Sequence, residues 1–342
     1  MYINKTYEGK TILVTGGAGA IGSNLVKKLS ELKAKTVIVL DNMVAGHQWA
    51  LPQNKNVLLV KGDINDDIML KRVFAESPSI VFHLAAFFAN QNSVDYPEKD
   101  LSTNGMGTLK LLEYSNLTKV DRFVYGSSGC SIYGKEAPLP LTEEFMSLNL
   151  SSPYQITKML GEVYCNFYKA HYGLKTVKAR FFNSYGPGEV PGQYRNVIPN
   201  FIYWALKGLP LPITGDGNQT RDFTYVGDLI NGLLAAGLED QAVGEEFNLA
   251  AGREIKIGEL ATMINERTGN KAGIKTIPKR VWDTKTRLLA SVEKAKNLIG
   301  YEPKTSFEEG LDEAIKWFKE NWDEIDRSHS FLPGASSAHR ES

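Results

Sequence analysis

Tyr154 and Lys158 stand four residues apart in a segment with the signals of a helix start. Ser152 can cap this helix, Pro153 suits its first position, and Gln155 completes the spacing of a capping box. The phenol and the ammonium would then share one helix face. A free tyrosine has a pKa of about 10, and a cation ~5 Å away at an effective dielectric of ~20 lowers it by roughly two units. With a second positive charge nearby, the phenol could act as a base near neutral pH.

A glycine-rich turn near the start of the chain predicts a dinucleotide site that would supply such a charge. Residues 11–15 form a β-rich run, residues 16–22 carry the glycines, and a helical pattern follows. In this context the glycines let the backbone approach a pyrophosphate at the helix N-terminus. The next predicted strand ends in Asp41, where an acid should bind the ribose hydroxyls of adenosine. With Asp41 in place and no arginine beside it in the sequence, the pattern favours NAD over NADP.

Strands and helices alternate along the first half of the chain, which predicts a doubly wound parallel α/β sheet. Ligands in such sheets bind at the carboxyl ends of the strands. Asp63, Ala85 and Ser128 each follow a predicted strand, so their side chains should converge on one crevice. The strands are predicted at 11–15, 36–40, 57–61, 80–84, 122–126 and 176–181, and the helices at 23–33, 66–75, 103–117 and 153–171.

Composition excludes several classes of protein. The 342 residues carry 39 basic and 39 acidic side chains, so the chain has no basic footprint for nucleic acid. Two cysteines, Cys130 and Cys165, fit a reducing compartment, and the histidines form no cluster of metal ligands. The most apolar run, 80–89, contains His83 and is too short to span a membrane. No signal-peptide core follows the polar start, so we expect a cytoplasmic protein.

Taken together, these features resemble the extended short-chain dehydrogenase/reductase superfamily in its nucleotide-sugar epimerase/dehydratase branch. The resemblance covers nearly the whole chain, and no single motif carries it. The motifs, in family order, are Thr15-Gly16-Gly17-Ala18-Gly19-Ala20-Ile21-Gly22, Leu40-Asp41-Asn42, Gly62-Asp63-Ile64, His83-Leu84-Ala85-Ala86, Asn104-Gly105-Met106-Gly107-Thr108, Tyr154-x-x-x-Lys158, Arg180-Phe181-Phe182-Asn183-Ser184-Tyr185-Gly186-Pro187 and Thr220-Arg221-Asp222-Phe223-Thr224-Tyr225-Val226.

The resemblance implies a Rossmann-type NAD-binding domain over residues 1–183 and a smaller α/β domain over 184–327 that binds a nucleoside-diphosphate sugar. The chain would partly return to the first domain, and helices 103–117 and 153–171 would pair in a homodimer. Residues 328–342 are polar and contain Gly, Ser and Pro, and this composition predicts a flexible tail. The implied NAD contacts are Gly16, Gly19, Ala20, Ile21, Gly22, Asp41, Asn42, Asp63, Ile64, Leu84, Ala85, Ala86, Asn104, Tyr154 and Lys158.

Chemistry in this branch begins with transient oxidation at carbon-4 of the hexose. By resemblance, Tyr154 removes the proton of the 4-hydroxyl group, while Lys158 lowers the pKa of the tyrosine and holds the nicotinamide ribose. A Ser or Thr after the fifth strand orients the hydroxyl. Counting from the strand end selects Ser128, whereas counting back from Tyr133 selects Gly129, which has no side chain to serve; we therefore expect Ser128.

The substrate contacts follow from the same resemblance. Arg221 matches the arginine that binds the diphosphate, and Arg280 or Arg287 matches the second one. The residue that sets the size of the sugar pocket would lie between Thr284 and Ser291. The other implied contacts, to the diphosphate, nucleoside and base, are Asn183, Asn196, Val197, Pro212 and Thr214.

The stretch after Ser128 separates the possible reactions. A 4,6-dehydratase needs an extra acid/base pair, and Ser128-Gly129-Cys130 offers no carboxylate, so a 4-epimerase is favoured. Cys130 keeps a 3,5-epimerase open, and a decarboxylase also remains an alternative. A non-enzymatic NAD-binding sensor is disfavoured, because such proteins typically lose the Tyr/Lys pair that this chain keeps.

Overall fold

The sheet at the centre of the molecule has seven strands, all parallel, in the order β11-β6-β5-β4-β1-β2-β3. The computed structural model describes residues 6–278 and 286–331. This strand order is that of a doubly wound dinucleotide-binding fold, so the predicted fold class is confirmed. The strands are β1 (Thr11–Thr15), β2 (Thr36–Asp41), β3 (Val57–Lys61), β4 (Ile80–His83), β5 (Arg122–Ser128), β6 (Thr176–Phe181) and β11 (Glu246–Leu249).

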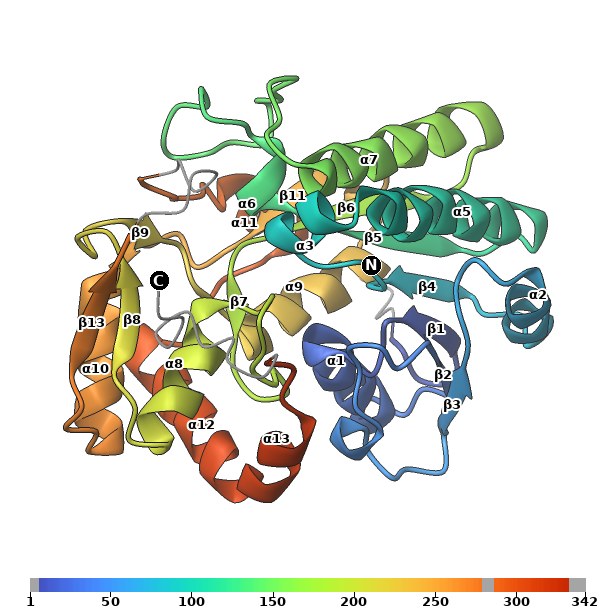
Figure 1. Cartoon of the computed structure of the whole chain (residues 1–342). Helices are drawn as coiled ribbons and strands as arrows, with labels where there is room; N and C mark the ends of the chain where they lie inside the picture. Colours follow the sequence, from blue (N-terminus) through green and yellow to red (C-terminus); the bar gives the residue numbers. More distant parts are fainter. Residues whose placement is uncertain (1–5, 279–285, 332–342) are drawn as a thin grey trace.

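Helices cover both faces of this sheet (Figure 1). Along β1, Ile12 and Val14 belong to one hydrophobic cluster and Leu13 to another, because successive side chains of a strand point to opposite faces. On the first face pack α1 (Ala20–Glu31), α9 (Val226–Leu238) and α11 (Glu293–Ile299), and on the second α2 (Asp67–Ala75), α5 (Gly107–Leu117) and α7 (Pro153–Tyr172).

The strand β11 comes from far along the chain. It pairs with β6 after α9 has packed against β5 and β6. The sequence analysis predicted a partial return of the chain to the first domain but no strand here, because four residues after a helix carry little periodic signal. The first part of the molecule therefore includes segments from beyond residue 183.

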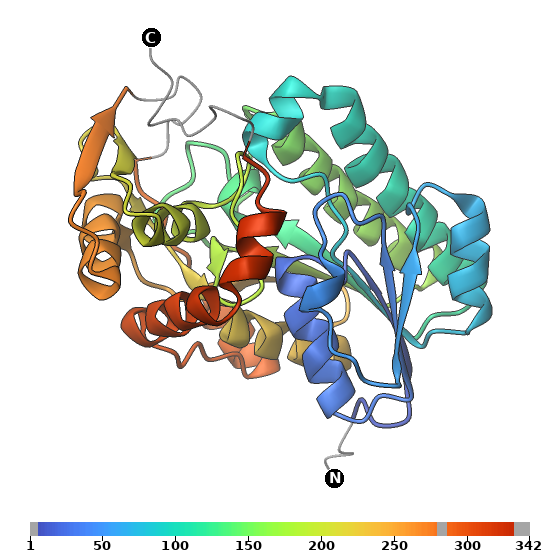
Figure 2. The same cartoon turned by 60° about the horizontal axis from the view of Figure 1, so that its bottom comes forward.

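A second part of the molecule lies beside the sheet and has its own apolar core (Figures 1 and 2). In both views α13 lies next to α1. The indole of Trp49 donates a hydrogen bond to Ser328 (3.1 Å) and stacks on Trp317, which joins the two parts. The elements of the second part are α8 (Val197–Leu206), β8 (Leu211–Thr214), α10 (Ile257–Thr268), β13 (Ile274–Ile277), α12 (Phe307–Glu320) and α13 (Trp322–Ser328).

Residues 328–331, which the sequence analysis assigned to a flexible tail, are packed in the structure. Ser330 pairs with Gly192, and the ring of Phe331 stacks on Trp204 with the centroids 5.5 Å apart. Residues 332–342 lie outside the described residues. Within the described ranges, no helix is long and apolar enough to cross a membrane.

The helix that carries Tyr154 and Lys158 begins as predicted. Ser152 caps α7 by accepting a hydrogen bond from the backbone N–H of Gln155 (3.3 Å), and Pro153 is the first helical residue. In a capping box the Gln155 side chain would accept from the N–H of Ser152. In the structure it accepts from the N–H of Ser151. The Ser152 hydroxyl also donates to the side chain of Asn90 (2.7 Å), and this bond connects α7 to α3.

The short elements mostly surround the carboxyl edge of the sheet. The helix predicted at 103–117 is divided into a π-helical turn, Leu101–Met106, and α5. The remaining elements are α3 (Asn90–Asp95), α4 (Pro97–Asp100), α6 (Gly129–Ile132), β7 (Ser184–Tyr185), β9 (Thr220–Arg221), β10 (Thr224–Tyr225), β12 (Ile255–Lys256) and the 3₁₀ turns Gln48–Ala50 and Asp240–Ala242.

Candidate active site

A cavity of about 1090 Å³ opens at the carboxyl edge of the sheet and continues along the second part of the molecule. Such an edge is where doubly wound folds bind their ligands. Of the residues singled out from the sequence, those that line the cavity are Gly16, Gly19, Ala20, Ile21, Gly22, Asp41, Asn42, Asp63, Ile64, Leu84, Ala85, Ala86, Ser128, Tyr154, Lys158, Asn183, Asn196, Val197, Pro212, Thr214 and Arg221.

The glycine turn between β1 and α1 has the shape that a pyrophosphate requires. Gly16 has a φ of +67°, and a Cβ on it would lie 2.6 Å from the backbone nitrogen of Ala85. A Cβ on Gly22 would overlap the carbonyl oxygen of Gly16. Gly19 caps α1 without a side chain, and no acidic residue occupies the first turn of the helix. The backbone N–H groups at this helix end therefore face the cavity without a competing anion, as a phosphate site needs.

Asp41 lies at the end of β2, where the adenosine ribose is expected. Its carboxylate accepts hydrogen bonds from the N–H groups of Ala18 (3.0 Å) and Met43 (2.8 Å), which fix its orientation. Burial raises the pKa of Asp41, and the two N–H bonds oppose that shift. Asn42 donates to Asp63 across the next strand end (3.2 Å), so these predicted cofactor residues form one hydrogen-bonded rim.

Asn104 is the predicted cofactor residue that does not line the cavity. Its amide holds the loop after β4: the side-chain oxygen accepts from the N–H of Phe87 (2.8 Å), and the nitrogen donates to the carbonyl of Phe87 (3.2 Å) and to Asp100 (2.7 Å). The side chain is buried with an exposed fraction of 1%. Asn104 therefore supports the loop that forms the cavity wall and does not itself line the cavity.

Tyr154 and Lys158 meet as predicted on one face of α7. The Nζ atom of Lys158 lies 5.7 Å from the centroid of the Tyr154 ring and donates a hydrogen bond to the carbonyl of Gly126 (2.8 Å). Burial lowers the pKa of Lys158 to about 8, and Asp100 opposes this shift. Burial raises the pKa of Tyr154, while a hydrogen bond with Ser128 lowers it. Lys158 alone therefore does not bring the phenol to neutral pH, because burial outweighs the predicted effect of its charge.

The structure places Ser128, and not Gly129, on the cavity. Ser128 is the last residue of β5, and its hydroxyl donates to Ser131 (2.9 Å). A Cβ on Gly129 would overlap the ring of Phe182, so this position accepts only glycine next to that ring. Cys130 also lines the cavity, and its sulfur accepts a hydrogen bond from the N–H of Asn183 (3.3 Å).

A buried ion pair lies behind these catalytic candidates. Arg180 donates to both carboxylate oxygens of Glu162, at 3.0 and 2.8 Å, and each residue has an exposed fraction of 1%. The hydroxyl of Ser127 donates to the same carboxylate (2.5 Å), and Arg180 also donates to the hydroxyl of Tyr133 (2.9 Å). The pair thereby joins α7 to β5 and β6 directly beneath Ser128. The sequence analysis did not single out Glu162, because Glu162 lies on α7 and its partner Arg180 comes from the separate element β6.

Of the two candidates for the second phosphate-binding arginine, the structure describes only one. Arg280 lies outside the described residues. Arg287 does not line the cavity, and its guanidinium pairs with Glu254 at the surface. Leu288 does line the cavity, with an exposed fraction of 3%, and it comes from the stretch predicted to set the size of the sugar pocket.

Several cavity residues were missed from the sequence. Glu189, Tyr194 and Arg195 come from the Gly/Pro-rich segment after β7 and its continuation, and Phe87 comes from the loop after β4. The sequence does not reveal the contacts of these residues, because the contacts depend on how the two parts of the chain meet.

Comparisons with known proteins agree with this geometry. Residues 12–250 match the model of the NAD dependent epimerase/dehydratase family. An epimerase of known structure from Methanothermobacter thermautotrophicus is 55% identical in sequence to this chain. The two structures superpose with a TM-score of 0.94, and the match covers 95% of this chain and 96% of that one. A UDP-glucose 4-epimerase from Thermotoga maritima, solved with UDP-glucose, is 37% identical with a TM-score of 0.87, covering 91% and 99%.

A UDP-N-acetyl-α-D-glucosaminuronate decarboxylase from Bacillus cytotoxicus is 33% identical over 322 residues, covering 91% of this chain and 98% of that protein. The relatives thus share the fold over nearly their whole length and differ in reaction. With the glycine turn, the Tyr/Lys pair and a family match over most of its length, the chain belongs to the NAD dependent epimerase/dehydratase family of enzymes.

Proposed function

We propose that this enzyme is an NAD-dependent 4-epimerase of a nucleoside-diphosphate sugar, with a UDP-sugar as the first candidate substrate. The observation that carries the proposal is the meeting of Tyr154, Lys158 and Ser128 on one cavity, next to the glycine turn that fits a pyrophosphate. Residues 129–132, directly after β5, carry the thiol of Cys130 and the hydroxyl of Ser131 and no carboxylate. A dehydratase would need such a carboxylate for its additional proton transfers.

Each side chain of the site has its own role in the proton transfer. Tyr154 takes the proton of the 4-hydroxyl group and later returns it, and Ser128, hydrogen-bonded to the phenol, orients that hydroxyl. Lys158, fixed by the carbonyl of Gly126, is placed to hold the nicotinamide ribose and to add positive charge beside the phenol. Bound NAD would supply the acceptor, and after reduction the donor, for the hydride of carbon-4.

Each part of the molecule would bind a different ligand. Residues 1–183, with α9 and β11, would hold the cofactor, and the rest of the segment 184–327 would hold the nucleoside diphosphate. Arg221 and Asn196 line the cavity on that side and suit the phosphates, and Pro212 and Thr214 of β8 suit the base. The relative solved with UDP-glucose supports uracil as the base.

Decarboxylation of a nucleotide-linked uronic acid is the second candidate. It would begin with the same oxidation at carbon-4, and one relative is a decarboxylase. Lys99 and Lys135 both line the cavity, and an ammonium group there would suit a sugar carboxylate.

The test is proton NMR of the sugar ring after the enzyme is incubated with UDP-, dTDP-, GDP- and CDP-hexoses and with UDP-glucuronate. A product with the coupling inverted only at carbon-4 supports the 4-epimerase. A 4-keto-6-deoxy product, a pentose product, or solvent deuterium at carbon-3 or carbon-5 would reject it.

Tyr154→Phe supplies the matched variant for this assay. Loss of the general base should reduce turnover by about 10²–10⁴-fold, with bound NAD unchanged. Tyr114→Phe removes a hydroxyl on α5 that lies 3.5 Å from the carbonyl of Asp67 and outside the cavity, so its turnover should be normal.

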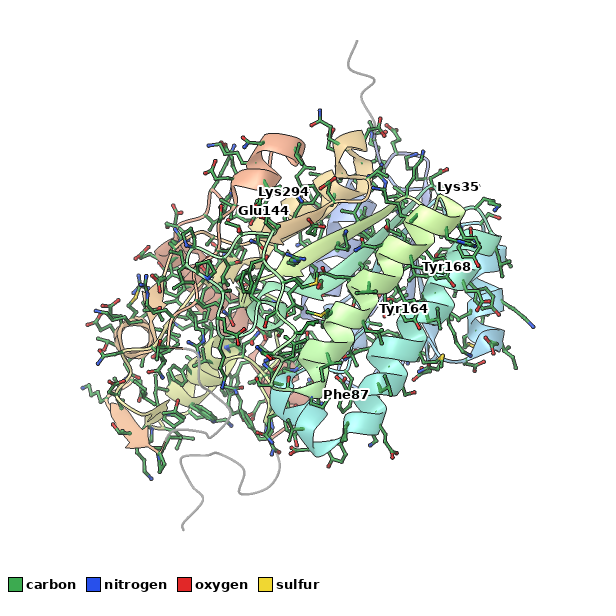
Figure 3. All side chains as sticks on the ribbon, turned by 90° about the horizontal axis from the view of Figure 1, so that it is seen from above. Lys35, Phe87, Glu144, Tyr164, Tyr168 and Lys294 are labelled. Atoms are coloured by element: carbon green, nitrogen blue, oxygen red, sulfur yellow. The ribbon has the colours of Figure 1, made fainter. Side chains whose placement is uncertain are left out.

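We also propose that the enzyme is a homodimer. Figure 3 shows α5 and α7 side by side, with Tyr164 and Tyr168 on α7. Large apolar side chains are exposed on these helices and on the turn before α5, which is unusual for a free surface. They are Leu101, Met106, Leu117, Ile156, Val163, Phe167 and Tyr172. Light scattering should give a dimer mass that Val163→Glu lowers; a monomeric wild type would reject the proposal.

A further inference from the structure

The segment from Pro187 to Asn196 crosses from the second part of the molecule to the first. Its middle is fastened to the second part: the backbone N–H of Gly192 donates to the Asn200 side chain (2.9 Å), and the carbonyl accepts from it (3.0 Å). The N–H of Ser330 donates to the carbonyl of Pro191 (3.2 Å), so the C-terminal residues of the described chain brace the same turn. This anchor is buried, since Pro191, Gly192 and Asn200 are all shielded from solvent.

Either side of this anchor, the segment reaches the first part at three separate places. The carbonyl of Pro187 accepts a hydrogen bond from Asn24 of α1 (2.8 Å). The hydroxyl of Tyr194 donates to Asp95 of α3 (2.9 Å). The guanidinium of Arg195 donates to the carbonyl of Ala45, in the loop after β2 (3.0 Å).

These three places surround the dinucleotide half of the cavity. Asn24 belongs to the first turns of α1, whose N-terminus forms the pyrophosphate site. Gly188, with a φ of +93°, lies against the same turn, where a Cβ would be 3.1 Å from the carbonyl oxygen of Ala20. Ala45 follows Asp41, at the adenosine ribose site. Tyr194 and Arg195 themselves line the cavity.

We propose that residues 187–196 form a strap that retains NAD in its cleft, and that Arg195 and Tyr194 are its two latches. Both latch bonds are exposed, whereas the anchor is buried and made of two hydrogen bonds between the same residues. The latches would therefore open first, while the anchor stays in place. Glu189 orients the strap from inside, because its buried carboxyl accepts from Asn196 (2.9 Å) and attracts the charge of Arg195.

Retention has a clear use in this family of reactions. An enzyme that returns the hydride to the sugar it came from needs no exchange of NAD between turnovers. A strap closed over the cofactor costs such an enzyme nothing in turnover, provided that the sugar can still enter at the other half of the cavity. This role depends on NAD binding and not on which sugar reaction follows.

The experiment measures the exchange of bound NAD for isotopically labelled NAD. Holoenzyme is mixed with excess labelled NAD, quenched with acid at intervals, and the bound fraction is analysed by mass spectrometry. Removing one exposed hydrogen bond should accelerate exchange about threefold to tenfold in Arg195→Ala and in Tyr194→Phe, and further in the double variant. Arg327→Ala is the matched control, because Arg327 pairs with Glu324 on α13 and does not line the cavity.

Two further readouts separate a latch from a general structural role. The variants should keep the melting temperature of the wild type, and with saturating NAD they should keep its KM for the sugar nucleotide. Exchange at the wild-type rate in the double variant would overturn the proposal. So would a raised KM for the sugar with unchanged exchange, because the segment would then serve the substrate. Exchange is measured without sugar, so its result is independent of the proposed 4-epimerase activity.

Discussion

The substitution Glu162→Gln tests the ion pair beneath the active site. Glu162 and Arg180 each have an exposed fraction of 1%, and the two carboxylate oxygens accept both guanidinium bonds. Burial lowers the pKa of Arg180, but the charge and hydrogen bonds of Glu162 outweigh burial and raise it. Glutamine keeps the shape of the side chain but replaces one acceptor oxygen with a donor, so a buried cation loses its counter-charge.

Breaking a buried pair in this way costs about 3–5 kcal/mol of unfolding free energy. With an m-value of about 3 kcal/mol/M, the midpoint of urea denaturation should fall by roughly 1 M. Tryptophan fluorescence can follow the transition. Turnover should also fall, because Glu162 lies one turn after Lys158 on α7 and holds the hydroxyl of Ser127, next to Ser128.

Glu302→Gln is the control for this measurement. Glu302 pairs with Lys296 at 3.3 Å, and both side chains are about half exposed, so its loss should change the unfolding free energy by less than about 0.5 kcal/mol. A loss below about 1 kcal/mol in Glu162→Gln would refute the assignment of the buried pair as the link between α7 and β5, as would equal losses in the two variants.

Three other substitutions test the cavity. Gly22→Ala should weaken NAD binding about tenfold to a hundredfold, because the new Cβ would overlap the carbonyl of Gly16; Gly258→Ala, whose Cβ has ordinary contacts, should retain NAD, and equal NAD content in the two would contradict the prediction. Burial raises the pKa of Glu189 to about 7, so the folded state holds this proton above pH 4.5 and the unfolding free energy should fall by about 3 kcal/mol as the pH rises from 4.5 to 7. Glu189→Gln should flatten this pH dependence, and an unchanged slope in urea titrations would exclude Glu189 as its source. Leu288→Ala should raise the ratio of kcat/KM for 2-acetamido over 2-hydroxy sugars about tenfold, and an unchanged ratio would mean that Leu288 does not limit the sugar pocket.

The parallel sheet explains why so much of the site was predictable from sequence. Asp41 and Ser128 end strands that short β-rich runs identify, the glycine turn follows another such strand, and parallel strands end at the same edge. Tyr154 and Lys158 needed only helical spacing and a cap. These signals are local, and the topology then brings them together without further information.

The contacts that sequence reasoning did not reveal are made between distant segments. Asn104 belongs to a family motif, but its amide is used by the backbone of Phe87. No arginine stands next to Asp41 in the sequence, yet Arg195 reaches the loop after Asp41 from the second part of the chain and donates to the carbonyl of Ala45. No pattern of spacing encodes such an approach, because it depends on how the two parts of the molecule pack.

The burial of Tyr154 and Lys158 bears directly on the chemistry of the site. Burial moves the pKa of the phenol up and that of the ammonium down, so in both residues it favours the neutral side chain. The phenol by itself therefore stays protonated near neutral pH, and a nearby positive charge lowers its pKa more in this buried site than it would in water. Oxidised nicotinamide is cationic and reduced nicotinamide is neutral. The positive charge of the oxidised ring would lower the pKa of the phenol and leave Tyr154 ionised, so that it can take the proton of the sugar hydroxyl. Beside the neutral reduced ring the pKa would rise, and Tyr154 would hold the proton that the ketone must regain. The burial that counts against the tyrosine as an isolated base is what lets it serve both directions of the reaction.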